Sequence, residues 1–466
     1  MVNVLLISTY ELGRQPFGLA EPAAWLERAG AKVSCLDLSR DELGEGAVGS
    51  ADIVAFYIPM HTATRLAVAV LPKVRRLNPR AKLAFYGLYA PVNEPYLRSL
   101  GAEIIVGGEF EEGLTRAVEG LAVGADLRVR PVEGASRFIG TPLPDVPVVS
   151  LARQKFLIPN RSGLPRPTRY AKLRLPNGEK KIVGSTEASR GCKHLCRHCP
   201  IVPVYNGHFR IIPRDIVLED IRQQVVAGVE HITFGDPDFL NGPRHALEIA
   251  QALHQEFPRL TYDATIKIEH LLKHSSCLAA LRDTGCLFVT SAAESVDDAV
   301  LARLDKGHTV ADFVAVVEHF REAGLCLSPT FVPFTPWTTL QGYLRLLERI
   351  LDLGMADNVA PVQLGIRLLI PAGSRLLELC EVREMTGPFD EAALVYPWAS
   401  PDPEVDELCR AVQASVHGAE KAGATRREIF ARVWELAHRA AGQPAPQLPK
   451  LRARATVPYL TEPWYC

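Results

Sequence analysis

Three cysteines stand within eight residues of one another. They are Cys192, Cys196 and Cys199, in the stretch EASRGCKHLCRHCP, with the spacing Cys-x3-Cys-x2-Cys. Four thiolates close a tetrahedral zinc or iron–sulfur site, whereas three leave one metal position open for another ligand. An open metal position indicates chemistry, so these cysteines are the first candidates for a catalytic centre.

Two other interpretations use the same cysteines. A structural zinc site could be completed by His194 or His198, although zinc sites usually pair two separated ligand couples. A thioredoxin-like redox pair could use Cys196 and Cys199, but the βαβ setting of such pairs is missing around them. Both interpretations stay open beside that of a cofactor-bearing site.

The composition is that of an ordinary globular protein. The chain has 466 residues, of which 47% are hydrophobic and 23% charged. That length suits about three domains of roughly 150 residues, or one large α/β barrel with additions. The net charge of −1 argues against a nucleic-acid partner, because phosphate binding needs a concentrated basic face. We therefore expect a small-molecule substrate.

The cysteine usage and the first residues predict a cytoplasmic protein without a membrane partner. Of the ten cysteines, seven are scattered outside the one tight cluster, which is unlike a secreted disulfide framework. The beginning, MVNVLLISTYELGRQ, has no positively charged leader. Its apolar run is far shorter than the roughly 20 residues of a membrane span, so we expect a first β-strand.

The pattern of apolar runs divides the chain into four parts. Residues 1–122 alternate apolar strands with amphipathic stretches, which predicts a Rossmann-like doubly wound α/β sheet with ligands at the strand ends. Residues 123–182 are proline-rich and typical of a linker laid over the surface. The βα alternation of residues 183–380 predicts a partial (β/α)6 barrel of the TIM type. Residues 381–466 predict a helical region over about 403–440 and an extended tail that ends in cysteine.

The cysteine spacing, in a loop that follows a short strand and precedes a (β/α)6 pattern, resembles the radical S-adenosylmethionine (SAM) superfamily. The resemblance implies that Cys192, Cys196 and Cys199 hold a [4Fe–4S] cluster whose fourth iron binds the amino and carboxylate groups of SAM. It also implies an electron donor such as flavodoxin or ferredoxin, and reductive cleavage of SAM. One departure is His198, where the superfamily often has an aromatic residue.

Further segments resemble the SAM-binding positions of that superfamily. FGDPD supplies Gly235 and Asp236, the segment KIE supplies Lys267, AAES supplies Glu294 and GIRLLIPAGS supplies Arg367. The resemblance implies that these residues contact SAM. The alternatives are a helix N-cap turn for Asp236 and an ordinary surface ion pair for Arg367.

A Rossmann-like domain before such a barrel resembles the cobalamin-binding radical SAM class. That class has cofactor loops where this chain has IPMHTAT, YGLYAPVNEP and VGGEFEEGL. However, Asp-x-His-x-x-Gly is absent, and His61 is the only histidine of residues 1–122. Many relatives bind cobalamin without a lower histidine, so cobalamin binding stays open. We favour a retained fold with an empty or altered site.

Over almost its whole length the chain is similar to the CUAEP/CCAEP-tail radical SAM proteins. The segments that carry this resemblance are GCKHLCRHCPIVPVYNGHFRIIPRD, HITFGDPDFLNGP, LARLDKGHT, PFTPWTTL and LTEPWYC. In that group the tail continues with a second cysteine or a selenocysteine and then Ala-Glu-Pro. The resemblance therefore predicts that the protein continues a few residues past Cys466; the alternative is a flexible end with one exposed thiol.

Soft thiolates bind trivalent arsenic, and the chain is similar to the radical SAM enzyme of arsinothricin biosynthesis. That resemblance implies transfer of the 3-amino-3-carboxypropyl group of SAM to arsenite. Cys466 would hold arsenic beside the cluster, with Cys326 or Cys286 from the barrel strands. The alternative for the two barrel cysteines is an ordinary place in the core.

The sequence thus predicts a radical SAM enzyme that transfers a SAM-derived group to a small acceptor, with arsenite as the sharpest hypothesis. One alternative is a cobalamin-dependent radical SAM methylase acting on a natural-product precursor. A second is a tRNA-modifying radical SAM protein, which would need extra N-terminal cluster cysteines where only Cys35 is available. A third is a non-catalytic zinc-binding module.

Overall fold

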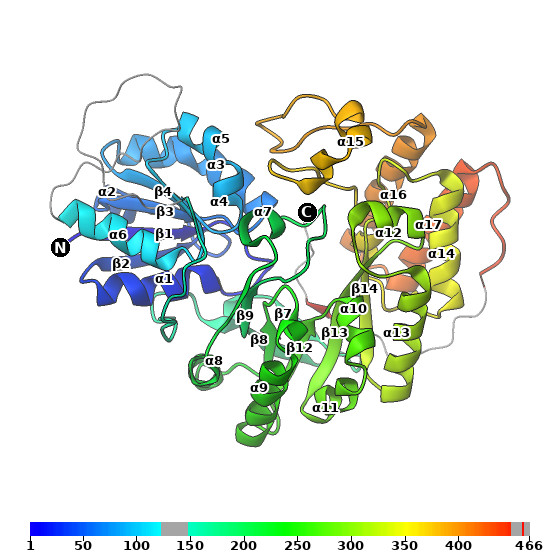
Figure 1. Cartoon of the computed structure of the whole chain (residues 1–466), viewed down its shortest axis with the longest axis horizontal. Coiled ribbons are helices and arrows are strands. Elements are labelled where there is room, and N and C mark those ends of the chain that lie inside the picture. The colour runs from blue at the N-terminus through cyan, green and yellow to red at the C-terminus, as the bar shows by residue number, and fades with distance from the viewer. Residues whose placement is uncertain (123–147, 449–458, 461–466) are drawn as a thin grey trace.

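The computed structural model describes residues 1–122, 148–448 and 459–460. Figure 1 shows an N-terminal unit, a second unit built around a curved sheet, and C-terminal helices packed beside the second unit. Among the described residues, no helix has both the length and the apolar character that a membrane span requires. The predicted α/β class, with a parallel N-terminal sheet and a partial barrel, is confirmed.

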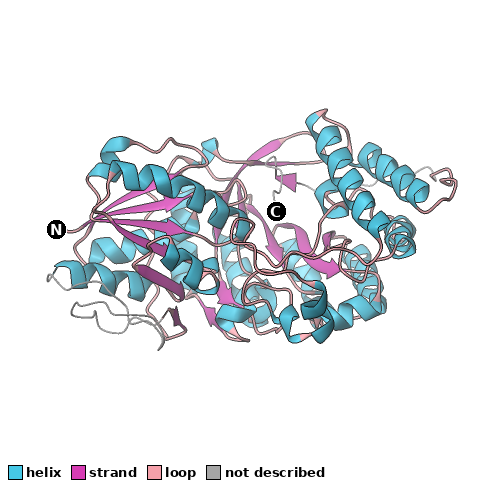
Figure 2. Cartoon of the chain, turned by 90° about the horizontal axis from the view of Figure 1, so that it is seen from above, coloured by secondary structure: helices cyan, strands magenta, loops and turns pink. Residues whose placement is uncertain are grey.

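The N-terminal unit is a six-stranded parallel sheet in the order β2-β1-β3-β4-β5-β6, with helices on both faces (Figure 2). Its central strands are mostly apolar because both faces of the sheet are covered there, whereas the edge strand at residues 32–37 is more polar and partly exposed. They are β1 (Asn3–Ser8), β2 (Lys32–Asp37), β3 (Ile53–Tyr57), β4 (Lys82–Tyr86), β5 (Ile104–Gly108) and β6 (Val149–Ser150). Its helices are α1 (Phe17–Arg28), α2 (Glu45–Gly49), α3 (His61–Leu77), α4 (Tyr89–Val92), α5 (Glu94–Ser99) and α6 (Glu111–Ala122).

The second unit is a curved sheet in the order β14-β13-β12-β11-β8-β7-β15. Its first five strands are parallel, and β7 and β15 continue the sheet in antiparallel fashion. The strands are β7 (Lys172–Arg174), β8 (Lys180–Thr186), β11 (His231–Phe234), β12 (Thr261–Thr265), β13 (Cys286–Glu294), β14 (Cys326–Phe331) and β15 (Tyr459–Leu460). A separate antiparallel pair, β9 (Ser189–Gly191) and β10 (Phe209–Ile211), flanks the cysteine-bearing segment.

Amphipathic helices cover the outside of this sheet. In α14, for example, Tyr343, Leu347 and Ile350 recur every three or four residues and are buried, which is the pattern of a helix that packs one face on a core. The helices of the described residues after 148, including those that do not cover the sheet, are α7 (Val202–Tyr205), α8 (Arg214–Val226), α9 (Pro243–Glu256), α10 (Ile268–Lys273), α11 (Cys277–Asp283), α12 (Asp298–Leu304), α13 (Val310–Ala323), α14 (Leu340–Asp352), α15 (Cys380–Met385), α16 (Pro403–Lys421) and α17 (Arg426–Ala440). Single 3-10 turns are η1 (Pro167–Arg169), η2 (Phe239–Asn241), η3 (Pro361–Leu364) and η4 (Arg375–Glu378).

Two segments differ from the sequence expectation. The predicted sixth barrel strand, PVQLGIRLLI, begins instead with the 3-10 turn η3, and a bridge between Phe334 and Arg367 stands where a continuous strand was expected. Pro361 lacks the backbone N–H that a continuous strand would need there. The predicted linker at 123–182 contributes β6 to one sheet and β7 to the other, while its residues 123–147 lie outside the described part. The predicted helical region at 403–440 is confirmed as α16 and α17.

Arg190 on β9 joins the two units. Its guanidinium contacts Glu21 of α1, lies 2.6 Å from Oε1 of Glu111 at the start of α6, and lies 2.9 Å from Oε2 of Glu187. Oε2 of Glu109 is 3.7 Å away. Arg190 is only 5% exposed, so these contacts are made without competing water. Because Cys192 follows two residues later, this ion cluster also positions the cysteine segment.

Replacing Arg190 with methionine should lower the free energy of unfolding by about 3–5 kcal/mol, since it leaves buried carboxylates without their cation. Urea denaturation measures the change. The matched control is Arg222, an exposed arginine between Glu219 and Glu256. The variant Arg222→Met should lower the free energy of unfolding by at most about 1 kcal/mol. Equal losses in the two variants would contradict a special role for Arg190.

Stability should also fall as the pH rises from about 4.5 to about 7. Burial raises the pKa of Glu109 from 4.5 to about 7, so in this window the folded chain binds more protons than the unfolded chain. The contribution of Glu109 to the free energy of unfolding is therefore complete below pH 4.5 and disappears above pH 7. Urea midpoints across this range test it. The variant Glu109→Gln should show a flatter pH profile, and an unchanged slope would exclude Glu109 as its source.

Candidate active site at the cysteine loop

The cysteine loop, residues 192–199, follows β9 at the end of the sheet where the parallel strands finish. The backbone N–H of Arg197 donates to the carbonyl of Leu304 at 2.9 Å, which ties the loop to α12. Gly191 before the loop has φ +72°, and a Cβ there would come within 2.4 Å of the His208 carbonyl and the Tyr205 ring. The close approach therefore requires glycine.

The three thiols of the loop suit a soft metal centre. All three are free, and Cys196 is only 7% exposed. Burial raises the pKa of Cys192 to about 11 and the pKa of Cys199 to about 12, and the nearby thiols add to both shifts. A metal ion that replaces the protons removes this cost of ionisation. Three thiols on one short loop are the ligand set of an iron–sulfur cluster with one open iron.

Glu294, at the end of β13, contacts a lysine and a histidine beside this loop. Its Oε1 accepts from Nε2 of His198 at 3.0 Å and from Nζ of Lys306 at 3.2 Å. Although burial opposes ionisation, Lys306 and His198 hold the pKa of Glu294 well below its usual range. Glu294 has φ +64°, a strained backbone for a residue other than glycine and a common feature of functional sites.

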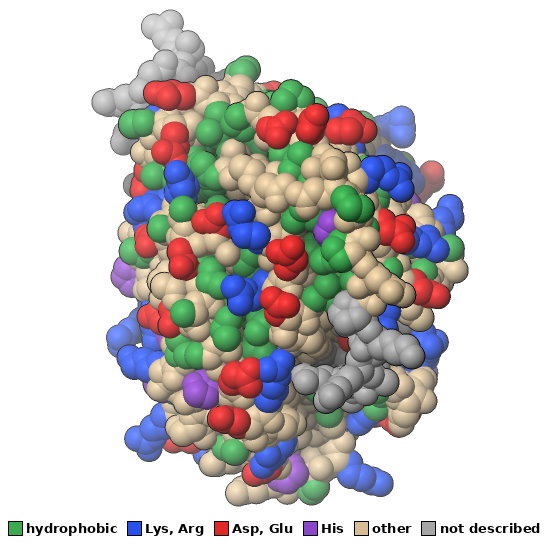
Figure 3. All heavy atoms as spheres, turned by 90° about the vertical axis from the view of Figure 1, so that its right-hand side faces the viewer, with side chains coloured by type: hydrophobic (Ala, Val, Ile, Leu, Met, Phe, Trp, Pro, Cys, Tyr) green, Lys and Arg blue, Asp and Glu red, His purple; other side chains and the backbone are tan. Residues whose placement is uncertain are grey.

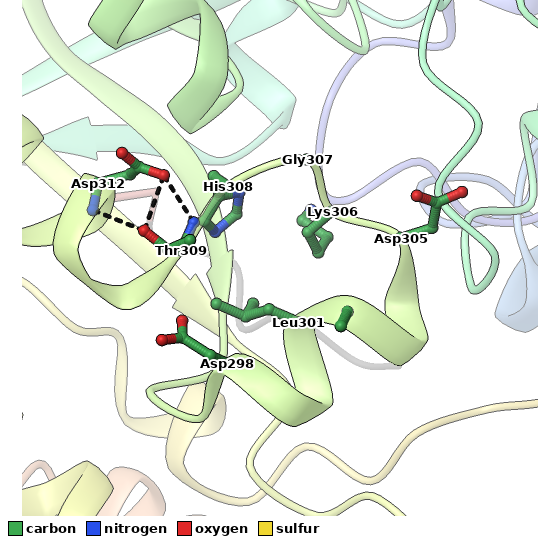
Figure 4. Close-up of a pocket in the computed structure, with 9 residues that line it drawn as sticks. Asp298, Leu301, Asp305, Lys306, Gly307, His308, Thr309 and Asp312 are labelled. Atoms are coloured by element: carbon green, nitrogen blue, oxygen red, sulfur yellow. Dashed lines mark hydrogen bonds between the residues drawn. The ribbon is translucent and has the colours of Figure 1, made fainter.

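Lys306 is 4% exposed and lies near the thiols of Cys196 and Cys199, whose charges interact with its ammonium. It also lines a hollow of about 290 Å³ between the end of α12 and the start of α13, shown in Figure 4. His308 and Asp305 line the same hollow. Sequence reasoning did not select Lys306, although a basic pair in the segment DKGHT directly after a helix was a usable signal.

The two glycine-motif residues have different surroundings. Gly235 is exposed at the end of β11, so a ligand can approach its backbone closely. The carboxylate of Asp236 is turned toward the chain instead: it accepts from the backbone N–H of Ala188 at 2.9 Å and from Oγ of Ser189 at 2.7 Å. Asp236 therefore supports the strand that leads into the cysteine loop, and its contact with SAM stays a prediction.

Lys267 and Arg367 lie in different places. Lys267 follows β12, pairs with Glu269 at 3.2 Å and interacts electrostatically with Cys192, so it belongs to the surroundings of the cysteine loop. Arg367 pairs with Asp406 of α16 at 2.6 Å and stacks on the ring of Trp398. These contacts match the ion-pair alternative for Arg367 rather than a SAM contact.

The structure does not agree with the role predicted for the two barrel cysteines, Cys286 and Cys326. Cys286 and Cys326 are the first residues of β13 and β14, whereas the cysteine loop lies where the parallel strands end. A strand of six residues spans about 20 Å, so neither thiol can share a ligand with the loop. Cys286 is 4% exposed and donates to the Phe288 carbonyl, in agreement with the core alternative. Cys466 lies outside the described residues.

The N-terminal unit has no available histidine, among its described residues, to bind the lower face of a corrinoid. Nε2 of His61 is 2.6 Å from the carbonyl of Ala393 and is therefore engaged. The ring of Tyr57 fills the space next to Gly18, where a Cβ would come within 2.1 Å of it. The rings of Tyr86 and Phe110 pack against this ring and against each other in tilted contacts. A cobalamin would have to bind without a histidine from this unit.

Residues 186–354 match the family model of the Radical SAM superfamily. Among curated proteins, the chain is similar to tRNA-2-methylthio-N(6)-dimethylallyladenosine synthase of Desulfosudis oleivorans, with 27% identity over 221 residues, 45% of this chain and 44% of that protein. The same enzyme of Geobacter sulfurreducens is 22% identical over 39% of this chain and 42% of its own length. The chain thus spans less than half the length of these relatives.

Two solved structures resemble almost the whole chain. The cobalamin-dependent SAM radical enzyme OxsB, with aqua-cobalamin and SAM bound, superimposes with a TM-score of 0.68 and 12% identity over 94% of this chain and 73% of its own. TsrM of Kitasatospora setae, a radical SAM methyltransferase with cobalamin and a [4Fe–4S] cluster bound, gives a TM-score of 0.66 and 16% identity over 95% of this chain and 100% of its own. At these identities the likeness concerns the fold.

A radical SAM domain implies a [4Fe–4S] cluster and SAM as cofactors, and the superfamily and these structural neighbours are enzymes. The three free thiols of the loop supply the ligand set that such a cluster requires. Residues 186–354 of this chain thus match the radical SAM domain, and the two-unit fold around them is similar to the folds of OxsB and TsrM.

Proposed function

We propose that the chain is a radical SAM enzyme that transfers a SAM-derived group to a small acceptor, and that the group is a methyl. The fold of the whole chain is the observation that supports transfer of a methyl group. The N-terminal unit and the barrel together, not the barrel alone, superimpose on TsrM and OxsB over 94–95% of this chain. TsrM is described as a methyltransferase.

The residues of the site would serve this function in distinct ways. Cys192, Cys196 and Cys199 would hold the [4Fe–4S] cluster, which when bound supplies the electron that breaks a carbon–sulfur bond of SAM. A low-potential donor such as flavodoxin or ferredoxin would provide that electron. Gly235 would let the methionyl end of SAM approach the backbone of β11, and Lys267 would attract its carboxylate.

Lys306 and Glu294 would set the charge beside the cluster. Three thiolates add negative charge to a partly buried loop, and Lys306 is a buried cation that interacts with two of them. Glu294 in turn fixes the ammonium at 3.2 Å. Because the reduction potential of an iron–sulfur cluster depends on nearby charge, this ion pair is suited to tune the ease of reduction.

Transfer of the aminocarboxypropyl group to arsenite is a second candidate, and the direction of β15 favours it. β15 is antiparallel to β7, and β7 is antiparallel to β8, so β15 runs toward the end of the sheet that carries the cysteine loop. Cys466 follows Leu460 by six residues in the sequence. The candidate now rests on Cys466 alone, since Cys326 and Cys286 lie at the other end of the strands.

We expect a small-molecule acceptor rather than tRNA, although the curated relatives act on tRNA. The chain carries a net charge of −1. The face in Figure 3 shows acidic and basic side chains interspersed, without a field of one sign. Phosphate backbones bind to concentrated basic surfaces, so neither observation favours a nucleic-acid partner.

Product analysis distinguishes these functions. The anaerobically reconstituted chain is incubated with SAM and reductant, with and without cobalamin or arsenite, and examined by mass spectrometry. Methyl transfer leaves S-adenosylhomocysteine, reductive cleavage at the ribose carbon leaves 5′-deoxyadenosine, and aminocarboxypropyl transfer leaves methylthioadenosine. We expect the first two with cobalamin present, together with corrinoid absorption of the protein. Methylthioadenosine formed only with arsenite would select the second candidate.

The control for this experiment is Cys192→Ala, which should abolish all three products by removing a ligand of the cluster. Turnover of SAM by this variant at the wild-type rate would exclude the proposed function in every form.

Lys306→Met should shift the reduction potential of the cluster to more negative values, because an added electron loses a neighbouring cation. Glu294→Gln should shift it in the opposite direction by removing a negative charge. Redox titration followed by electron paramagnetic resonance measures both. Lys180 is exposed at the start of β8, at the far end of the sheet, so Lys180→Met should leave the potential unchanged. Equal potentials in all four proteins would refute the tuning role.

A further inference from the structure

Three side chains that no part of the proposed reaction uses meet beside the cysteine loop. They are His194 in the loop itself, Asp238 after β11 and His270 on α10. One ligand atom of each lies within 4.8 Å of the others. Nε2 of His194 is 3.7 Å from Oδ2 of Asp238 and 3.2 Å from Nε2 of His270. Three separate segments of the domain thus direct donor atoms to one point.

The group is buried and its polar atoms are incompletely bonded. Asp238 and His270 are each 1% exposed. Oδ2 of Asp238 and Nδ1 of His270 are 2.7 Å apart, yet they are not aligned as a hydrogen bond, and neither has another hydrogen-bond partner among the described residues. Two electron-rich atoms this close repel each other unless a cation is shared between them. That cation is either a proton on the imidazole or a metal ion.

The atoms of Asp238 and His194 that face away from the group have partners of their own, as the far atoms of metal ligands usually do. Oδ1 of Asp238 accepts from the backbone N–H of Leu240 at 3.1 Å. Nδ1 of His194 is 3.4 Å from Oε2 of Glu269, and Lys267 holds the same carboxylate oxygen at 3.2 Å. A carboxylate on the far nitrogen of a histidine orients the ring and raises its basicity as a ligand. Nε2 of His194 is thereby left to face the centre.

We propose that His194, Asp238 and His270 form a mononuclear site for a divalent first-row metal ion such as Zn²⁺ or Fe²⁺. Two imidazoles and one carboxylate are a common ligand set for these ions, and three protein ligands leave a position open for water or a substrate oxygen. The site is separate from the three thiols and does not depend on the proposed function. Since His194 lies between Cys192 and Cys196, a bound ion would also brace the cysteine loop against β11 and α10.

Cobalt titration tests the site. The full chain is dialysed against a chelator, its cluster is then assembled so that the thiols are occupied, and Co²⁺ is added while visible absorption is recorded. We expect one Co²⁺ per chain in addition to the cluster iron, with d–d bands of nitrogen and oxygen ligation. Asp238→Asn and His270→Gln should weaken binding by at least about tenfold. Asp238→Asn keeps an oxygen for the Leu240 N–H, which preserves the local turn.

The matched control is His274→Gln, which changes a histidine at the end of the same helix. The ring of His274 is 6.0 Å from that of His270 but takes no part in the group, so this variant should bind Co²⁺ like the wild type. Three results would overturn the proposal: no Co²⁺ beyond the cluster, thiolate-to-cobalt charge-transfer bands, or equal loss of binding in His274→Gln. The first would show that a proton alone bridges Asp238 and His270.

Discussion

The ion cluster around Arg190 is the constraint on which the rest of the site depends. A single buried guanidinium meets carboxylates from α1 and α6 of the N-terminal unit and from the barrel. Phe17, Phe110 and Phe156 surround it, so the low local dielectric strengthens each ion pair and penalises the loss of any partner. The strand that carries Arg190 leads directly into Cys192. The distance between the cysteine loop and the N-terminal unit is therefore fixed by electrostatics rather than by a flexible linker.

Charges of both signs are then distributed on two sides of the cysteine loop. On one side Glu294 holds Lys306 and His198; on the other, Asp238 and Glu269 face His194 and His270. Glu294 ends β13, Asp238 follows β11, and Glu269 lies in the first turn of the helix α10 that follows β12. All three therefore lie at the edge of the sheet where the parallel strands end, which is where such sheets bind ligands. A loop that would take up an anionic cluster thus lies between two lysines, Lys306 on one side and Lys267 on the other.

The sequence predicted the parts of the fold that depend on local patterns. Alternating apolar runs predicted both sheets and the C-terminal helices, and the cysteine spacing predicted the loop. It could not predict the pairing of β15 with β7 or the partners of Arg190, because both join residues that are far apart in the chain. The basic pair in DKGHT marks Lys306 as a candidate, but only the structure shows that its side chain is buried beside the thiols. Cys326 and Cys286 could have been placed, since residues at the beginning of a parallel strand lie opposite the ligand-binding end.

The N-terminal unit has a role that holds with or without a corrinoid. Its strand order gives the crevice between β1 and β3 where doubly wound sheets bind ligands, yet Tyr57 packs tightly on Gly18 and His61 is bound to the Ala393 carbonyl. Tyr205, six residues after Cys199, donates to the carbonyl of Gly108 at the end of β5, and Figure 1 shows α7 between the two units. The unit therefore closes over the segment that follows the cysteines. This contact joins the end of β5 to the helix that follows the cysteines, so the N-terminal unit helps to position the loop even if its own ligand crevice is empty.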